Sequence, residues 1–218
     1  MDLEVIIDNK KIKADASETI LQVARRNNIE IPTLCYLKNI NEPASCRVCV
    51  VEVEGMKNLC TACSTKVRNG MVVKTNTNKV IKARKNAIEL LLSNHNQNCL
   101  SCPKNLKCEF QKLCNQFQCT NKFEGEKSEF KIDDSNNAIV RDESKCILCG
   151  KCVSVCAKNQ GCYAIGKVNR GFETKVSTAF EKPMQKSSCV GCGQCVLVCP
   201  TGALTQKNNL KDVFNILD

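Results

Sequence analysis

The sequence reads CILCGKCVSVC at 146–156 and CVGCGQCVLVCP at 189–200, and this repeat decides the fold of the region around it. Both copies have the spacing C-x2-C-x2-C-x3-C, which is the bacterial cysteine run for two [4Fe–4S] clusters. In such a run three neighbouring cysteines ligate one cluster, and the fourth ligates the other. The repeat therefore predicts one cluster on Cys146, Cys149, Cys152 and Cys199, and a second on Cys189, Cys192, Cys195 and Cys156.

The residues between these cysteines suit a loop that wraps a cluster. Glycines at 150, 191 and 193 tolerate unusual backbone angles and let the backbone approach closely. The first copy has Ala157 where a proline would be usual, and this departure removes no ligand. A zinc ribbon is the alternative, but it would use two CxxC pairs rather than two matched runs of four.

A second group of cysteines lies in the N-terminal part of the chain. Cys35, Cys46 and Cys49 have the spacing C-x10-C-x2-C, which is related to the plant-type [2Fe–2S] pattern but wider. Either Cys60 or Cys63 can supply the fourth ligand. A structural zinc site on the same residues is the alternative interpretation.

The sequence around this group predicts a small mixed sheet with a packed helix. Alternating apolar residues predict a hairpin with strands at 3–7 and 11–14, and a further strand is expected at 48–55. Asp15 or Ser17 can cap the helix that follows the hairpin. The expected buried face of that helix consists of Ile20, Leu21, Val23 and Ala24.

The only histidine of the chain precedes a third group of cysteines. His95 follows a predicted amphipathic helix at 78–93 and is followed by Cys99, Cys102 and Cys108. An imidazole in place of one thiolate makes a cluster less negative, which should raise its potential, as in His-ligated Rieske centres. The alternative is a histidine at a helix C-terminus that interacts with the helix dipole.

Fifteen cysteines and His95 fill these four predicted sites, out of 19 cysteines in the chain. The four that remain are expected to be packing thiols, and they are Cys60, Cys114, Cys119 and Cys162. Cys114 or Cys119 could in principle replace Cys108 as a ligand, which is the less favoured arrangement.

Composition and charge narrow the function further. The start of the 218-residue chain lacks the basic and apolar segments of a signal peptide, so we expect a reducing, cytoplasmic location and metal ligation rather than disulfides. No apolar run is long enough to span a membrane. Four bound clusters would lower the formal charge of +10 to roughly +3. Because the basic residues are scattered among acidic ones, nucleic-acid binding is not expected.

These patterns predict an α+β chain of three small domains and a tail. The expected ranges are 1–77 for the [2Fe–2S] domain, 78–120 for the histidine-containing domain, 138–205 for the two-cluster domain and 206–218 for a C-terminal helix. The polar stretch at 120–138 is the expected linker.

The order of the motifs resembles one group of iron–sulfur proteins. The phrases IPTLCYL, SCRVCVVEVEG, TACSTKV and GMVV, the H-x3-C-x2-C-x5-C run and the cysteine repeat carry the resemblance over nearly the whole chain. They resemble the N-terminal iron–sulfur region of [FeFe] hydrogenases, the large iron–sulfur subunit of complex I and the small diaphorase subunit of NAD-linked hydrogenases. The phrases KNQG (158–161) and NRGF (169–172) look most like the hydrogenases.

This resemblance implies a β-grasp [2Fe–2S] domain, a [4Fe–4S] domain with one histidine and three cysteine ligands, and a bacterial-type two-cluster ferredoxin domain. It favours Cys63 over Cys60, because the family places its fourth ligand in the TACSTKV segment. The implied cofactors are one [2Fe–2S] and three [4Fe–4S] clusters.

The implied function is single-electron transfer without catalysis. The chain would connect an NAD(P)H-oxidising flavoprotein, or a ferredoxin, to a catalytic hydrogenase or formate dehydrogenase subunit. Because the sequence stops at Asp218, where the catalytic domain of a monomeric hydrogenase would follow, we expect a separate subunit or an excised N-terminal portion with no catalytic residues of its own. A freely diffusing polyferredoxin is the alternative.

Overall fold

A β-hairpin begins the computed structural model, which describes residues 2–125 and 130–217. β1 (Asp2–Ile7) pairs antiparallel with β2 (Lys10–Asp15) along its full length. The turn residues Asp8 and Asn9 have φ values of 47° and 68°, the left-handed conformation that two-residue hairpin turns require. The predicted hairpin is confirmed in type and position.

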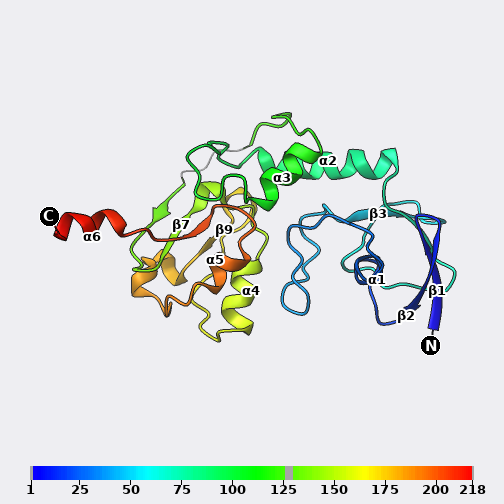
Figure 1. Ribbon diagram of the computed structural model, residues 1–218, viewed down its shortest axis with the longest axis horizontal. Helices are drawn as coiled ribbons and strands as arrows, with labels where there is room; N and C mark the ends of the chain where they lie inside the picture. The colour runs from blue at the N-terminus through cyan, green and yellow to red at the C-terminus, as the bar shows by residue number, and fades with distance from the viewer. Residues whose placement is uncertain (1, 126–129, 218) are drawn as a thin grey trace. The chain divides into compact units, whose positions relative to one another are not determined.

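The hairpin is part of a five-stranded mixed sheet with the order β2-β1-β5-β3-β4 (Figure 1). Its other strands are β3 (Val50–Val53), β4 (Cys60–Thr61) and β5 (Val72–Lys74). β5 runs parallel to β1 and antiparallel to β3. Because successive strand residues point to opposite faces, alternate valines and isoleucines of β1, β3 and β5 form one buried face.

α1 (Ile20–Arg26) packs on this face, and its four predicted apolar residues are buried there. The predicted caps were wrong, because Thr19 caps the helix instead. Its side chain accepts a hydrogen bond from Gln22 N–H, and the Gln22 side chain accepts one from Thr19 N–H. Ser17 donates to Asp15 within a separate turn, so neither residue is available to the helix.

Two further helices belong with the sheet. α2 (Asn78–Leu92) begins at the capping residue Thr77, and α3 (Glu109–Gln116) lies beside α2 (Figure 1). The segment between them belongs elsewhere: the chain forms one compact unit from residues 2–93 and 109–125 and another from 94–108 and 130–217. The domain ranges proposed from the sequence therefore do not correspond one to one with these units, and they remain proposals.

The second unit contains two small sheets. One has the order β10-β7-β6 and the other pairs β8 with β9, all antiparallel. The strands are β6 (Ile132–Asp133), β7 (Ile139–Asp142), β8 (Gly166–Val168), β9 (Lys175–Ser177) and β10 (Leu204–Gln206). Ile139, Ile165, Val176 and Leu204 form an apolar core together with several cysteines of the repeat.

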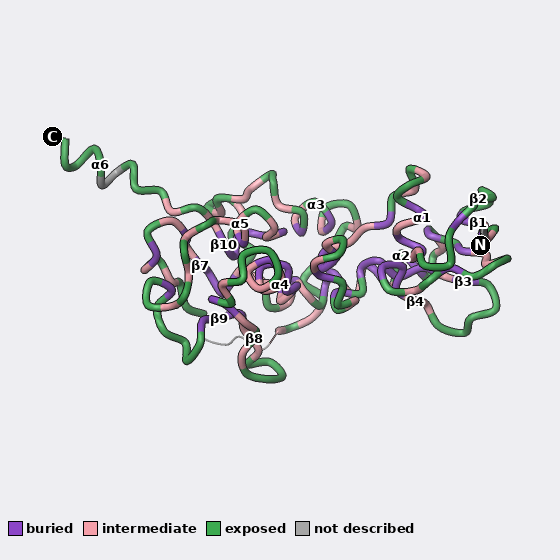
Figure 2. Tube along the Cα trace, turned by 90° about the horizontal axis from the view of Figure 1, so that it is seen from below, coloured by how far each residue is buried: buried purple, intermediate pink, exposed green. Residues whose placement is uncertain are grey.

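The repeat gives this unit two matching helices, α4 (Lys151–Lys158) and α5 (Gln194–Val198), which contact each other. Short 3-10 turns occur at η1 (Glu143–Lys145), η2 (Gly171–Glu173), η3 (Ala179–Glu181) and η4 (Met184–Lys186). The predicted C-terminal helix is present as α6 (Leu210–Leu217), and its described side chains are exposed (Figure 2). None of the described helices could cross a membrane.

Candidate iron–sulfur centres

The four cysteines predicted near the N-terminus come together in two contacting pairs. The Sγ atoms of Cys49 and Cys63 are 3.3 Å apart, and the thiols of Cys35 and Cys46 are hydrogen-bonded to each other. All four are buried, whereas Cys60 is only half-buried. The sheet fixes two of these positions, because Cys49 directly precedes β3 and Cys63 closely follows β4.

The electrostatics of this group favour binding of positive charge. The hydrogen bond from Cys46 lowers the pKa of Cys35 to about 5, and the contact with Cys63 lowers the pKa of Cys49 to about 7. The same contacts, together with burial, raise the pKa of Cys46 and Cys63. Only one thiol of each pair therefore ionises readily, and a bound cationic core would allow the others to ionise as well.

The cysteine repeat surrounds two cavities, and each cavity is lined by cysteines from both copies. A cavity of about 110 Å³ is lined by Cys146, Cys149, Cys152 and Cys199. A smaller one of about 20 Å³ is lined by Cys156, Cys189, Cys192 and Cys195, and also by Cys162. The structure thus brings together the cysteines of each crossed set that the spacing predicts, with Cys162 beside the second set.

Electrostatic coupling groups the same cysteines. Burial raises the pKa of Cys152, and the neighbours that raise it further include Cys146, Cys149 and Cys199. Burial likewise raises the pKa of Cys195 to about 12, with further contributions from Cys189, Cys192 and Cys156. Cys152 and Cys195 therefore stay protonated unless a positive charge compensates for their burial.

The backbone has the same conformation in both copies of the repeat. Leu148 and Gly191 are left-handed, with φ values of 55° and 67°, and so are Gly150 and Gly193, with 79° and 73°. As a result the Leu148 N–H points at the Cys146 Sγ at 3.4 Å, and the Gly191 N–H points at the Cys189 Sγ at 3.5 Å. Left-handed angles strain Leu148, because only glycine adopts them freely.

Three members of the histidine-containing group lie near two short segments of the second unit, residues 142–145 and residues 200–202. The Cys108 thiol donates to the Pro200 carbonyl at 3.4 Å, and a Cβ added to Gly202 would lie 2.5 Å from the Cys102 Sγ. His95 is electrostatically coupled to Lys145 and Asp142. Cys99 belongs to the same turn as Cys102, since its carbonyl accepts the Cys102 N–H at 3.1 Å.

The environment of His95 keeps its imidazole neutral. Burial and, next, the positive charge of Lys145 lower its pKa to about 4, against an opposing contribution from Asp142. A neutral imidazole has a nitrogen lone pair and can act as a metal ligand at physiological pH. The residue therefore fits the role that the sequence predicts for it.

Within residues 2–125 and 130–217, no three His, Cys, Asp or Glu side chains converge on a point that could hold a single metal ion. Iron–sulfur ligands differ from the ligands of a single ion, because each binds an iron at a different corner of the cluster. The cysteine sulfurs around each cavity of the repeat are the donor set that such a group requires.

Several polar residues near the sulfurs were not predicted from the sequence. Arg84, on α2, is 2% exposed and donates from Nη2 and Nε to the Val50 carbonyl at 2.9 and 3.2 Å. Burial lowers the pKa of Arg84 to about 10, and the charge of Cys49 opposes this. Asn136 donates to the Cys189 Sγ at 3.7 Å, and the Thr201 hydroxyl lies 3.6 Å from the Cys199 Sγ.

Three families match successive parts of the chain. Residues 1–78 match the 2Fe-2S iron-sulfur cluster binding domain. Residues 84–122 match the NADH-ubiquinone oxidoreductase-G iron-sulfur binding region, and residues 145–203 match the 4Fe-4S dicluster domain. The α+β fold class is therefore confirmed, and the chain contains 2Fe-2S and 4Fe-4S iron–sulfur binding domains.

The resemblance to hydrogenases and complex I is confirmed as well. The chain is 43% identical to the NADP-reducing hydrogenase subunit HndD of Solidesulfovibrio fructosivorans, over 99% of this chain and 38% of that protein. It is 39% identical to iron hydrogenase 1 of Clostridium pasteurianum, over 98% of this chain and 38% of that protein. The chain thus spans well under half the length of these relatives.

Among solved structures, the chain is similar to one from the NAD+-reducing [NiFe]-hydrogenase in its H2-reduced state. The TM-score is 0.87 at 26% identity, over 94% of this chain and 87% of the other. The chain is therefore related to iron–sulfur subunits of NADH- and NADPH-linked hydrogenases and of complex I.

Proposed function

We propose that this chain is a non-catalytic, cytoplasmic subunit that relays single electrons through one [2Fe–2S] and three [4Fe–4S] clusters. Electrons would pass between an NAD(P)H-oxidising flavoprotein, or a ferredoxin, and a catalytic hydrogenase or formate dehydrogenase subunit. The observation that carries the proposal is the pair of cavities lined crosswise by the cysteine repeat. The names of the relatives support the choice of a hydrogenase and of an NADP-linked reaction.

The proposed ligands are the sixteen residues predicted from the sequence. The [2Fe–2S] cluster takes Cys35, Cys46, Cys49 and Cys63, and the histidine-ligated [4Fe–4S] cluster takes His95, Cys99, Cys102 and Cys108. The remaining two clusters take the crossed sets of the repeat. When bound, each cluster supplies a site that accepts and releases one electron.

The protein's own contribution is to bury the clusters and to direct hydrogen bonds at their sulfurs. The N–H groups of Leu148, Ala164 and Gly191 point at Cys146, Cys156 and Cys189 at 3.3–3.5 Å. Such donors stabilise negative charge on sulfur, and hence the reduced state of the site. Their placement adjusts the potential of each site without altering its ligands.

Within the second unit, one segment connects two of the proposed sites. Pro200, Thr201 and Gly202 follow the ligand Cys199 directly, and Cys108 and Cys102 lie against Pro200 and Gly202. The histidine-ligated cluster would therefore lie next to the cluster that takes Cys199. This gives a short route for an electron between the two.

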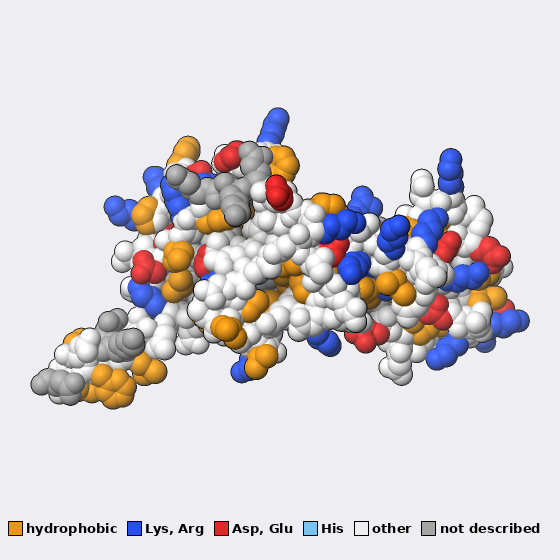
Figure 3. Space-filling view, turned by 90° about the horizontal axis from the view of Figure 1, so that it is seen from above, with side chains coloured by type: hydrophobic (Ala, Val, Ile, Leu, Met, Phe, Trp, Pro, Cys, Tyr) orange, Lys and Arg blue, Asp and Glu red, His pale blue; other side chains and the backbone are white. Residues whose placement is uncertain are grey.

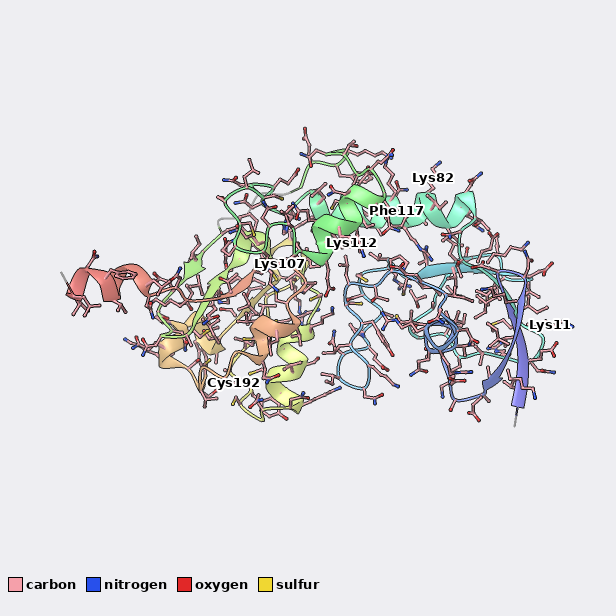
Figure 4. The ribbon with its side chains drawn as sticks, viewed as in Figure 1. Lys11, Lys82, Lys107, Lys112, Phe117 and Cys192 are labelled. Atoms are coloured by element: carbon pink, nitrogen blue, oxygen red, sulfur yellow. The ribbon has the colours of Figure 1, made fainter. Side chains whose placement is uncertain are left out.

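The other cluster of the repeat is the better placed for exchange with a partner. Cys192 is exposed and lies at the edge of the second unit (Figure 4). Val190 and Leu197 near it are 68% and 75% exposed. On the face shown in Figure 3, by contrast, basic and acidic side chains are interspersed. We infer that this apolar rim contacts the partner.

Cluster content tests the proposal. The full chain, loaded anaerobically, should hold about 14 iron atoms, from one two-iron and three four-iron clusters. Cys149→Ser should remove or convert one [4Fe–4S] signal in electron paramagnetic resonance (EPR) spectra. Cys114→Ser, at a cysteine that lines neither cavity, is a matched control that should leave every signal in place. Full iron content and unchanged spectra in Cys149→Ser would contradict the ligand assignment.

Purification from native cells separates the two candidate functions. A subunit should co-elute with a flavoprotein and a catalytic subunit. If the loaded chain elutes alone, at the 24.1 kDa of the chain, it is the freely diffusing polyferredoxin instead.

A further inference from the structure

Two cysteines that belong to none of the proposed clusters contact each other at the end of α3. The thiols of Cys114 and Cys119 are hydrogen-bonded, and the Cys119 N–H donates to the Cys114 carbonyl at 2.9 Å. Both residues are half-buried, so solvent-borne reagents can reach them. In Figure 4, Lys112 lies on α3 and Phe117 directly follows its last residue.

The backbone explains why the two thiols meet. The hydrogen bond from Cys119 N–H back to the Cys114 carbonyl, with Gln118 left-handed at a φ of 48°, is the Schellman ending of a helix. In this motif the side chains at the two ends of that bond commonly make an apolar contact. Here both positions are cysteines, so the helix ending holds two thiols together.

We propose that Cys114 and Cys119 form a dithiol–disulfide site, which low-molecular-weight disulfides oxidise by thiol–disulfide exchange. This chemistry transfers two electrons at once, whereas the clusters transfer them singly. The sequence suggested that Cys114 and Cys119 are packing thiols, and this proposal gives them a redox role instead.

The exchange proceeds in two steps. The thiolate of one cysteine attacks one sulfur of the small disulfide, which forms a mixed disulfide, breaks the reagent's S–S bond and releases one small thiolate. The thiol of the other cysteine then gives up its proton and attacks the protein sulfur of the mixed disulfide, which forms the Cys114–Cys119 disulfide and releases the second small thiol. The protein loses two electrons and two protons, and both end on the two released thiols.

The surroundings of Cys119 act on its thiol in two directions. Burial and the carboxylate of Glu89 raise the pKa of Cys119, whereas Lys85 and the hydrogen bond from the Cys114 thiol lower it. Glu89 is itself 2% exposed and accepts hydrogen bonds from the N–H and hydroxyl of Thr120, at 3.1 and 3.4 Å. Because the Cys114 thiol donates its hydrogen bond to Cys119, these contacts do not single out one attacking cysteine, and the exchange gives the same disulfide from either.

A peptide of convenient composition makes the site testable. Trypsin cleaves after Lys112 and Lys122, and the peptide 113–122, LCNQFQCTNK, contains these two cysteines and no other. The cluster-loaded full chain is incubated anaerobically with glutathione disulfide, quenched in acid, alkylated with N-ethylmaleimide and digested. We expect the doubly alkylated peptide to be replaced by an unalkylated peptide that is two hydrogens lighter than the dithiol form. Dithiothreitol should reverse this change, and the protein should lose no iron.

Two variants complete the experiment. Cys114→Ser should keep its iron and abolish the internally oxidised peptide, whereas Asn115→Ser, on the same helix turn, should still form it. The proposal fails if the peptide remains doubly alkylated at every ratio of oxidised to reduced glutathione. It also fails if Cys114→Ser loses a cluster, because Cys114 would then be a ligand.

Discussion

Arg84 places a buried positive charge beside the N-terminal cysteine group, and this defines a first prediction. Replacing it in Arg84→Gln should lower the reduction potential of the [2Fe–2S] cluster, because the added electron loses a nearby cation. Stability should also fall by about 1.5–3 kcal/mol, the usual value of a hydrogen bond from a charged group such as that to Val50.

Potentiometric EPR titration measures the first effect and denaturant unfolding the second. Lys82→Gln is the matched control, since Lys82 is an exposed cation on the same helix (Figure 4). An equal shift of potential in both variants would mean that Arg84 acts only through the overall charge of the protein.

His95 leads to a second prediction. His95→Cys should retain a cluster but shift its potential downward, because a thiolate adds a negative charge that the neutral imidazole lacks. The low pKa of His95, about 4, means that the native residue adds no positive charge of its own near neutral pH. If an EPR titration shows no change in any signal, His95 is not a ligand.

At the scale of the elements, the close approach of Gly202 to Cys102 leads to a third prediction. A methyl group at position 202 would lie 2.5 Å from the Cys102 Sγ, so Gly202→Ala must displace that sulfur or the chain. We expect the EPR signal of the histidine-ligated cluster to shift or disappear. Gly166→Ala is the control, because a Cβ there meets nothing within 4 Å. Unchanged signals in both variants would place Cys102 outside the ligand set.

The sequence predicted the features that depend on a fixed spacing of residues along the chain. The placing of cysteines from both copies around each cavity followed from the repeat, whose spacing sets three cysteines on one tight loop. The residue that caps α1 could not be predicted from the sequence, since Asp15, Ser17 and Thr19 are all good capping residues and only the fold selects among them. Arg84 escaped notice because periodicity treats a charged residue as exposed, although its neighbours Val80 and Ile88, four residues away on either side, mark a buried face.

At the scale of the whole molecule, cluster loading changes the charge, which gives a fourth prediction. The formal charge of +10 should fall to roughly +3 when four clusters bind. The loaded protein should therefore leave a cation-exchange column at lower salt than the cluster-free chain at pH 7. Elution of the loaded form at the same or higher salt would contradict the proposed number of clusters.

The division into two units was the feature hardest to derive from sequence. Residues 94–108 connect α2 to α3 without a break in the sequence pattern. The two helices nevertheless belong to the first unit, whereas residues 94–108 belong to the second. Local periodicity contains no information about which distant segment a loop will contact. Here that segment is Pro200–Gly202, nearly a hundred residues further along the chain.

The crossed lining of the two cavities also constrains how the protein is made. When synthesis has reached Cys156, three of the four cysteines that line the first cavity are present, but the fourth, Cys199, has not yet been synthesised. The second cavity likewise waits for Cys189, Cys192 and Cys195. The two sites thus become complete together and late, whereas the group from Cys35 to Cys63 is complete before a third of the chain exists. Cofactor insertion into this protein is therefore expected to follow the order of synthesis, beginning at the N-terminal group.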